Sequence, residues 1–132
     1  MAKNSRRKGA TGERELARIL RDEYGFKDAK RGQQYCGVAG NADVIDALPG
    51  IHIECKRVER LSLYEAMAQA KRDAREGELP AVFHRKNHAG WLVVMELDDY
   101  MNLYREWASG HELEKRGADD GEPENLPEMR QL

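Results

Sequence analysis

The segment that decides the fold runs from Asp43 to Lys56 and reads DVIDALPGIHIECK. Pro49-Gly50 is a turn signal between two short runs rich in β-branched residues, so the segment predicts a β-hairpin. A hairpin folds the start of its first strand back beside the end of its second strand. The carboxylate of Asp43 is therefore expected near that of Glu54, with Lys56 next along the same face.

The second strand of this hairpin has one apolar and one polar face. Ile51, Ile53 and Cys55 alternate with His52, Glu54 and Lys56. Two converging carboxylates suit a hard divalent cation such as Mg²⁺, which prefers oxygen ligands. A neighbouring lysine can polarise an attacking water or neutralise charge on a phosphate. An ordinary amphipathic hairpin with a solvated Glu/Lys pair is the competing interpretation, because this spacing is common.

The composition describes one domain with unevenly distributed charge. A chain of 132 residues has room for a modest core. Its 22 Lys and Arg residues and 24 Asp and Glu residues give a net charge of −2, which by itself argues against a strongly basic nucleic-acid binder. Residues 1–35, however, hold ten basic and five acidic side chains, whereas residues 111–132 hold three basic and seven acidic ones. The chain is thus basic at its start and acidic at its end.

No segment predicts export or membrane insertion. The N-terminal basic cluster is not followed by the apolar core of a signal peptide, and no stretch is apolar for long enough to span a bilayer. Cys36 and Cys55 lie nineteen residues apart without a Cys-x-x-Cys or histidine pairing, so both are interpreted as free thiols. The expectation is a soluble, cytoplasmic protein, with no membrane partner and no small-molecule organic cofactor.

A basic arm, residues 1–9, opens the chain. It is expected to be mobile, and it fits equally a frayed terminus and a segment that contacts phosphates. Its cations are Lys3, Arg6, Arg7 and Lys8. The helix that follows is predicted from Ala10 or Thr11 to Tyr24, with Gly25 as its stop.

Glu13 is the unusual residue of this helix. At about 100° per residue it falls at the centre of the apolar stripe, over Ala17, Leu20 and Tyr24, whereas Glu15 points the opposite way. An acid on the buried side of a first turn is either a partner of the helix dipole or a functional carboxylate held over a site. The helix alone does not decide between the two.

The remaining segments complete an order of helix, strands, helix, strands, helix. They are a strand at Phe26–Ala29, a helix from Leu63 to Gly77 opened by a Ser62–Glu65 capping box, a strand hairpin of Ala81–Arg85 and Trp91–Glu96, and a helix from Asp98 or Asp99 to Gly110. Residues 1–110 are expected to form one α/β domain, a mixed β-sheet flanked by helices in the order α-β-β-β-α-β-β-α. Residues 111–132 are expected to be an acidic, disordered tail.

Two further places are candidates for contacts with nucleic acid. Arg14 and Arg18 lie a turn apart on the flank of the first helix, where they face either a phosphate backbone or solvent. The loop of residues 30–41 contains Arg31, Gln33 and three glycines, and its cations and amides favour a contact surface. A plain glycine-rich connection is the alternative for this loop.

Several of these pieces together resemble one nuclease family. The chain resembles the archaeal-type Holliday junction resolvases, which are members of the PD-(D/E)xK nuclease superfamily. The segments that carry the resemblance are Lys8-Gly9-Ala10, Glu13 to Leu16, the glycine loop with Arg31, Asp43-Val44-Ile45, and Ile53 to Lys56. The similarity covers about residues 6–96 and extends to the small resolvase-type nucleases of bacteriophages and prophages. It implies a restriction-endonuclease-like core and a phage or prophage origin.

The resemblance also implies roles for individual residues. Asp43 and Glu54 would ligate Mg²⁺, or Mn²⁺ in its place, together with Glu13 and the backbone carbonyl of Cys55. Lys56 would complete the catalytic motif. The candidates for contacts with branched DNA are Lys3, Arg6, Arg7, Lys8, Arg14, Arg31, Gln33 and Gln69.

The sequence departs from the family pattern at two places. Ala42 stands before Asp43, where the family motif has a proline, and the acidic tail has no counterpart. Asp46 is a rival acid in the hairpin. Because it lies three residues from Asp43, it should occupy the opposite strand face and be exposed to solvent.

The leading hypothesis is a Mg²⁺-dependent endonuclease that resolves four-way DNA junctions by paired phosphodiester hydrolysis. Two symmetric incisions need two active sites, which implies a homodimer. A nicking enzyme, or a nuclease for forks, flaps or plain duplex, is the first alternative. A non-catalytic DNA-binding module would be expected to lack one of the acids or the lysine, and all are present. A metal-free structural protein would leave Glu13 unexplained.

Overall fold

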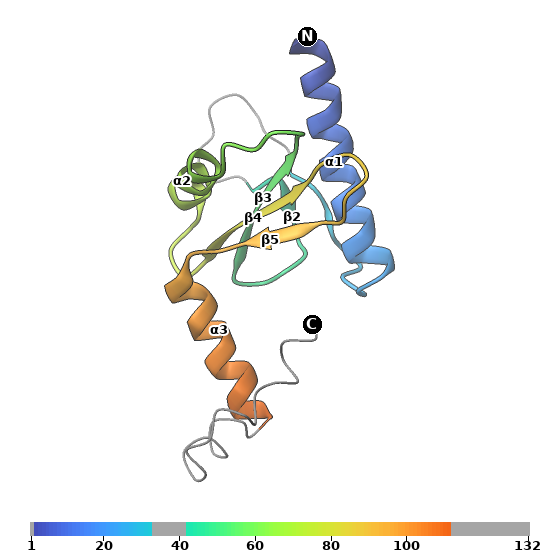
Figure 1. Ribbon diagram of the computed structural model, residues 1–132. Coiled ribbons are helices and arrows are strands. Elements are labelled where there is room, and N and C mark those ends of the chain that lie inside the picture. Colours follow the sequence, from blue (N-terminus) through green and yellow to red (C-terminus); the bar gives the residue numbers. More distant parts are fainter. Residues whose placement is uncertain (1, 33–41, 112–132) are drawn as a thin grey trace. The chain divides into compact units, whose positions relative to one another are not determined.

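The computed structural model describes residues 2–32 and 42–111, with side chains from Gly9 onward. The chain divides into two compact units, Met1–Glu96 and Leu97–Leu132. Figure 1 shows the sheet with helices α1 and α2 in the first unit, and helix α3 in the second. The predicted domain boundary at residue 110 and the predicted acidic tail stay predictions, because residues 112–132 lie outside the described part of the chain.

The described elements follow one another in the predicted order. They are α1 (Ala2–Asp22), β1 (Lys30–Arg31), β2 (Val44–Ile45), β3 (Ile51–Arg57), α2 (Leu63–Asp73), β4 (Leu79–Arg85), β5 (Leu92–Val94) and α3 (Leu97–Gly110). The strands form one five-stranded sheet in the order β1-β2-β3-β4-β5. Strands β3 and β4 are parallel, and the other neighbours are antiparallel. The predicted α/β fold with a mixed sheet and a restriction-endonuclease-like core is confirmed.

The predicted hairpin is formed by β2 and β3. Val44 pairs with Ile53 in antiparallel register, and Gly50 in the turn has a φ of +86°, which glycine adopts without a Cβ clash. Strand β3 pairs in parallel with β4, and the register begins with Ile51 beside Leu79. Helix α2 forms the crossover connection between these two strands. The strand that carries Glu54 and Lys56 is therefore the centre of the sheet.

In the first unit, each face of the sheet carries one helix (Figure 1). On the α1 face, Leu16, Ala17 and Leu20 form a core with Ile53, Cys55 and Phe83. On the α2 face, Ala66, Met67 and Ala70 pack against Val82. Successive residues of a strand point to opposite faces, so the polar face of β3 lies under α2. His52 and Glu54 are consequently only 1% and 2% exposed.

The first helix begins earlier than predicted. Helix α1 begins at Ala2, so residues 2–9 are helical and the predicted start at Ala10 or Thr11 is wrong, whereas the role of this basic arm stays a prediction. No proline interrupts this stretch, and Lys and Arg have high helix propensity, so the helix continues through Gly9. It ends at Asp22, and Tyr24 is 67% exposed instead of lying on the buried stripe.

Three other predicted details are wrong. Phe26–Ala29 is not a strand, and β1 is instead the two-residue Lys30–Arg31, which pairs with β2. Helix α2 begins at Leu63 as predicted, but Ser62 makes no side-chain cap hydrogen bond. The helix ends at Asp73, before the predicted stop at Gly77, because Ala74 is already extended, with φ −64° and ψ 139°.

The second unit is described by helix α3 and His111. The helix begins at Leu97 and ends at Gly110, so Asp98 and Asp99 lie in its first turn and neither is its cap. Acidic side chains in a first turn favour the helix dipole. None of the helices in the described ranges is both long enough and apolar enough to cross a membrane.

Candidate active site on the central hairpin

Asp43 lies directly before β2 and is 3% exposed. The backbone N–H of Cys55 donates a hydrogen bond of 2.7 Å to its Oδ2 atom, which holds the carboxylate beside β3. Burial, followed by the charge of Glu54, raises the pKa of Asp43 to about 8. The charge of Glu13 acts in the same direction, and the Cys55 N–H opposes it. Asp43 and Glu54 therefore lie close enough to interact, as the hairpin predicted.

Glu54 lies on the α2 face of β3 with its two oxygens in different environments. Its Oε1 atom lies 3.2 Å from Nε2 of His52, and its Oε2 atom lies 3.7 Å from Nζ of Lys56. All three side chains share this face because they alternate along the strand. The carboxylate is thereby held between an imidazole on one side and an ammonium on the other.

Lys56 is fixed by α2. Its Nζ atom donates a hydrogen bond of 3.0 Å to Oε1 of Gln69, and its side chain is 28% exposed. A lysine side chain alone samples many rotamers, so this contact with α2 orders the charge. The ammonium remains accessible to a ligand in solution while it stays beside Glu54.

Glu13 is buried on α1, as the helical stripe predicted, with 8% of its surface exposed. Gly12 lets α1 lie close to the end of β3, because a Cβ atom at residue 12 would lie only 2.3 Å from Cβ of Arg57. Nε of Arg31 donates to Oε1 of Glu13 at 2.5 Å. Glu13, a predicted metal ligand, is therefore paired with Arg31, a predicted phosphate contact.

Glu15 lies on another side of α1 from Glu13, but it is not left in solvent. Its Oε1 atom accepts hydrogen bonds from Nη1 of Arg85 at 2.9 Å and from Nε1 of Trp91 at 3.0 Å. Helix α1 lies across the sheet, so a second side of the helix meets the end of β4 and the start of the final hairpin strand. Asp46, by contrast, is exposed as predicted and lies 3.5 Å from Nζ of Lys30.

Sequence reasoning missed two residues beside Glu54. The donor atoms of His52, Glu54 and Asp73 all lie within 4.8 Å of one another. The alternation along β3 already placed His52 on the same side as Glu54. The contribution of Asp73 has no sequence signal, because only the packing of α2 brings the end of that helix over β3.

Two shallow depressions near these residues are rich in cations. One, of about 530 Å³, lies along α1 and β1, and its lining includes Arg14, Arg18, Arg21, Lys30 and Arg31. The other, of about 490 Å³, lies beside α2, and its lining includes Lys56, Arg60, Gln69 and Arg72. Of the predicted DNA contacts, Arg14, Arg31 and Gln69 line these depressions. Other cations that were not predicted as DNA contacts line them as well.

The other predicted DNA contacts are less fully described. The backbone of Lys3, Arg6, Arg7 and Lys8 belongs to α1, but their side chains lie outside the described part. Gln33 lies in residues 33–41, which the structure does not describe. Cys36 falls in the same range. Cys55 is a buried free thiol whose pKa is raised by burial, so its thiol is not a candidate nucleophile.

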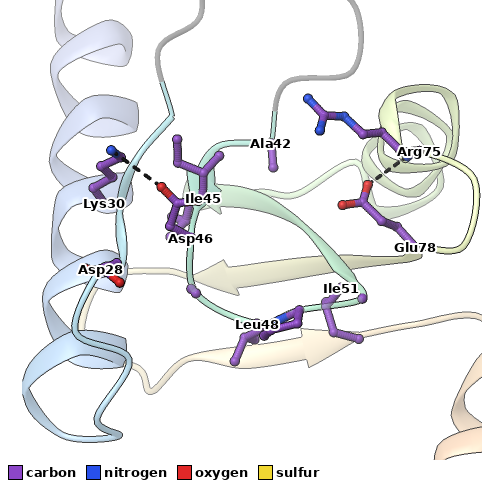
Figure 2. A pocket seen from close by; sticks show the side chains of 13 residues that line it. Asp28, Lys30, Ala42, Ile45, Asp46, Leu48, Ile51, Arg75 and Glu78 are labelled. Atoms are coloured by element: carbon purple, nitrogen blue, oxygen red, sulfur yellow. Dashed lines mark hydrogen bonds and ion pairs between the residues drawn. The ribbon is translucent and has the colours of Figure 1, made fainter.

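A pocket of about 900 Å³ lies apart from these carboxylates. Figure 2 shows it between the turn of the hairpin and the segment that follows α2. Three of its charged side chains have partners: Lys30 pairs with Asp46, and Oε1 of Glu78 accepts from the backbone N–H of Arg75 at 2.8 Å. Neither Asp43 nor Glu54 lines it. We therefore place the candidate active site at the carboxylates and not in this pocket.

The comparisons with known proteins identify the family. A family model described as "Phage putative PDDEXK endonuclease" matches residues 4–116, and the match includes Asp43, Glu54 and Lys56. No curated protein and no solved structure matches the chain. The predicted PD-(D/E)xK superfamily is confirmed, whereas the narrower resemblance to Holliday junction resolvases stays a prediction. With carboxylates and a lysine gathered on its central hairpin, the chain belongs to this family of phage PDDEXK endonucleases.

Proposed function

We propose that the protein is a metal-dependent DNA endonuclease whose catalytic residues are Asp43, Glu54 and Lys56, with Glu13 contributing from α1. Membership of an endonuclease family supports the class of activity. The observation that carries the assignment is that the buried Asp43 carboxylate accepts from the N–H of Cys55, directly beside buried Glu54, which lies next to the partly exposed Lys56. A non-catalytic module that only kept the fold would not need this combination.

The chemistry of the donors fits Mg²⁺. Asp43 and Glu54 are both buried, and two adjacent carboxylates are costly to bury without a compensating cation. Lys56 compensates only in part, because it lies 3.7 Å from one oxygen of Glu54. Mg²⁺ binds through a few carboxylates and keeps several waters, and Mn²⁺ accepts the same ligands. We assign the backbone carbonyl of Cys55 as a further ligand, and Glu13 as one when its ion pair opens.

The protein groups then have distinct tasks. Asp43 and Glu54 would hold the divalent cation, which when bound would supply a water of lowered pKa and positive charge near the phosphate. The Lys56 ammonium can donate a hydrogen bond to a non-bridging phosphate oxygen, where negative charge grows as the phosphodiester is hydrolysed. Gln69 acts through Lys56, because its Oε1 atom accepts from that ammonium and holds it in place. No covalent enzyme intermediate is required.

The cationic depressions support DNA as the substrate. The depression along α1 contains Arg31, which is also the partner of Glu13, so it borders the candidate site. Arg14 and Arg18 are exposed on the same helix. Such side chains contact phosphates without reading bases, so recognition by backbone position and branched shape is expected. Among the described elements there is no helix-turn-helix or zinc finger that would favour base readout.

We further propose a four-way junction as the preferred substrate and a homodimer as the active form. Resolution requires two incisions at symmetric positions, and one compact site in each of two copies meets that requirement. Forks, flaps and single nicks in duplex DNA are the alternatives within the same chemistry. A panel of labelled substrates with mapped incisions separates these possibilities, because only a junction resolvase makes paired cuts on opposite strands.

The assigned residues are tested by Asp43→Asn and Lys56→Ala in junction cleavage with Mg²⁺. Each substitution is expected to lower the cleavage rate by at least about a hundredfold, the size of effect typical for loss of a single electrostatic group. Binding of the junction in EDTA should largely survive in both variants, because most of the proposed contacts with phosphates come from other cations, such as Arg14, Arg18 and Arg31. Gel-based cleavage and fluorescence anisotropy provide the two measurements.

Asp46→Asn is the matched control, because it changes an exposed acid of the same hairpin. It should cut at the rate of the unmodified protein. Cleavage by Asp43→Asn at that rate would show that the site is assigned to the wrong residues. Absence of cleavage by the unmodified protein on every substrate, with either Mg²⁺ or Mn²⁺, would favour a non-catalytic DNA-binding module.

A further inference from the structure

His52 is buried in an unusual environment in the first unit. Its ring is 1% exposed and lies on the α2 face of β3. Nε2 lies 3.2 Å from Oε1 of Glu54. Nδ1 has no hydrogen-bond partner among the described residues, and Oε1 of Glu78 is 4.0 Å from it. Buried polar atoms nearly always have a partner, so this histidine needs an explanation.

A third donor, Asp73, approaches the same point from the end of α2. The donor atoms of His52, Glu54 and Asp73 all lie within 4.8 Å of one another. Atoms that bind one ion at about 2.1 Å each lie at most about 4.2 Å apart, so a small rotation of the half-buried Asp73 side chain brings the set into range. Two of the three donors are almost fully buried, which distinguishes this cluster from acids on a surface.

We propose that His52, Glu54 and Asp73 form a second divalent-cation site, selective for a transition metal such as Mn²⁺, Co²⁺ or Zn²⁺. An imidazole nitrogen favours these ions over Mg²⁺, which prefers oxygen ligands alone. The site is distinct from the catalytic set of Asp43, Glu54 and the Cys55 carbonyl. It shares one residue with that set, so it rests on the proposed function and deepens it.

Glu54 can serve both sites because its two oxygens face different partners. Oε1 faces His52, whereas Oε2 lies on the side of Lys56. A carboxylate can bridge two cations in this way, with one oxygen on each. An ion at the second site would fix the orientation of Glu54 and so hold its other oxygen toward the catalytic set.

Glu78 completes the surroundings of the second site. Metal-bound histidines usually donate their other ring N–H to a carboxylate, and Oε1 of Glu78 lies 4.0 Å from Nδ1 of His52. The backbone N–H of Arg75 already holds that carboxylate in place. Glu78 also lines the 900 Å³ pocket (Figure 2), and its side chain is 30% exposed, so solvent reaches this carboxylate.

Pulsed electron paramagnetic resonance of Mn²⁺ bound to the full chain tests the site, because a nitrogen ligand couples to the metal and an oxygen ligand does not. The protein is first stripped with EDTA and then titrated with Mn²⁺. We expect a nitrogen coupling in the unmodified protein and its loss in His52→Gln. Asp73→Asn should weaken Mn²⁺ binding at this site at least about tenfold. Circular dichroism and the melting temperature show whether each variant folds.

The control variants separate this site from the chain's other donors. Asp46→Asn and Asp43→Asn should both keep the nitrogen coupling, because neither residue belongs to the cluster. A coupling that persists in folded His52→Gln would come from one of the chain's three other histidines and would overturn the proposal. If His52→Gln does not fold, Asp73→Asn decides, and unchanged Mn²⁺ affinity there would also overturn it.

Failure of this site can be told from failure of the proposed function. Loss of the nitrogen coupling in Asp43→Asn would mean one ion bound by all these residues, and no second site. Cleavage by Asp43→Asn at the unmodified rate would instead refute the catalytic assignment while leaving Mn²⁺ at His52 intact. The two measurements use different readouts, since one records a spectrum in the absence of DNA and the other records product.

Discussion

At the scale of single residues, the site concentrates negative charge in a place that water barely reaches. Asp43 and Glu54 are 3% and 2% exposed, and Glu13 is 8% exposed. Glu13 is paired with Arg31, and Glu54 is flanked by Lys56. Burial and the charge of Glu54 raise the pKa of Asp43. A carboxyl group that is costly to ionise in the folded protein makes the stability of that protein depend on pH.

The metal-free protein is expected to lose stability between about pH 4 and pH 8. The pKa of Asp43 rises from 3.8 to about 8 on folding, so above pH 4 the unfolded chain releases a proton that the folded protein keeps. Stability contributed by this group therefore falls as pH rises through this window, by an amount on the order of a few kcal/mol. Melting temperatures in EDTA across the window measure it.

The comparison with Asp43→Asn isolates this residue from other titrating groups. The variant should show a flatter dependence of melting temperature on pH between 4 and 8, and it should be the more stable protein at pH 8. Saturating Mg²⁺ should raise the stability of the unmodified protein most at high pH. An unchanged slope in the variant would contradict the burial of an interacting Asp43.

At the scale of the elements, local signals predicted the structure well and long-range packing did not. The hairpin of β2 and β3 follows from Pro49-Gly50 and from strict alternation, and both are local. Strand β1 has only two residues and is defined by its pairing with β2, so the sequence has no alternation long enough to predict it. Helix α2 covers His52 and Glu54 through tertiary contacts, so the polar face of β3 is buried and the competing interpretation of a solvated hairpin face does not hold.

The close approach of α1 to the end of β3 yields a prediction at this scale. A Cβ atom at Gly12 would lie 2.3 Å from Cβ of Arg57 and 2.9 Å from its Cγ, so one of the two elements must shift. Gly12→Ala is expected to destabilise the protein by about 1–3 kcal/mol, although alanine favours helices by about 1 kcal/mol. Urea denaturation followed by circular dichroism measures the change.

Gly9→Ala is the matched control in the same helix. No atom lies within 4 Å of a Cβ built at Gly9, so only the gain in helix propensity remains, up to about 1 kcal/mol of stabilisation. Opposite signs for the two substitutions are therefore expected. Equal effects would mean that α1 does not pack against Arg57 as described. Cleavage by Gly12→Ala should fall as well, since the shift displaces Glu13.

At the scale of the whole molecule, the net charge of −2 conceals how the cations are placed. The basic excess in residues 1–35 was readable from the sequence, but the depression that gathers Arg14, Arg18 and Arg31 requires α1 and β1 to lie together. The proposed catalytic residues Asp43, Glu54 and Lys56 could be selected from the sequence because their spacing is a motif. The histidine cluster could not be, because its third member comes from a different element.

This arrangement predicts how DNA binding responds to salt. Removing one cation that pairs with a phosphate should reduce the slope of log K against log salt by about 0.9 for duplex DNA. The double substitution Arg14→Ser/Arg18→Ser is therefore expected to reduce that slope by about two and to weaken binding about equally across sequences. Anisotropy titrations in EDTA between about 50 and 200 mM salt span a useful range.

Arg105→Ser is the control for this double variant, because Arg105 is an exposed cation of α3 and lines neither depression. Its slope should equal that of the unmodified protein, since a cation that touches no phosphate releases no counterion when DNA binds. An unchanged slope in the double variant would move the DNA path away from α1 and toward the second depression. Arg60 and Arg72 would then become the residues to remove.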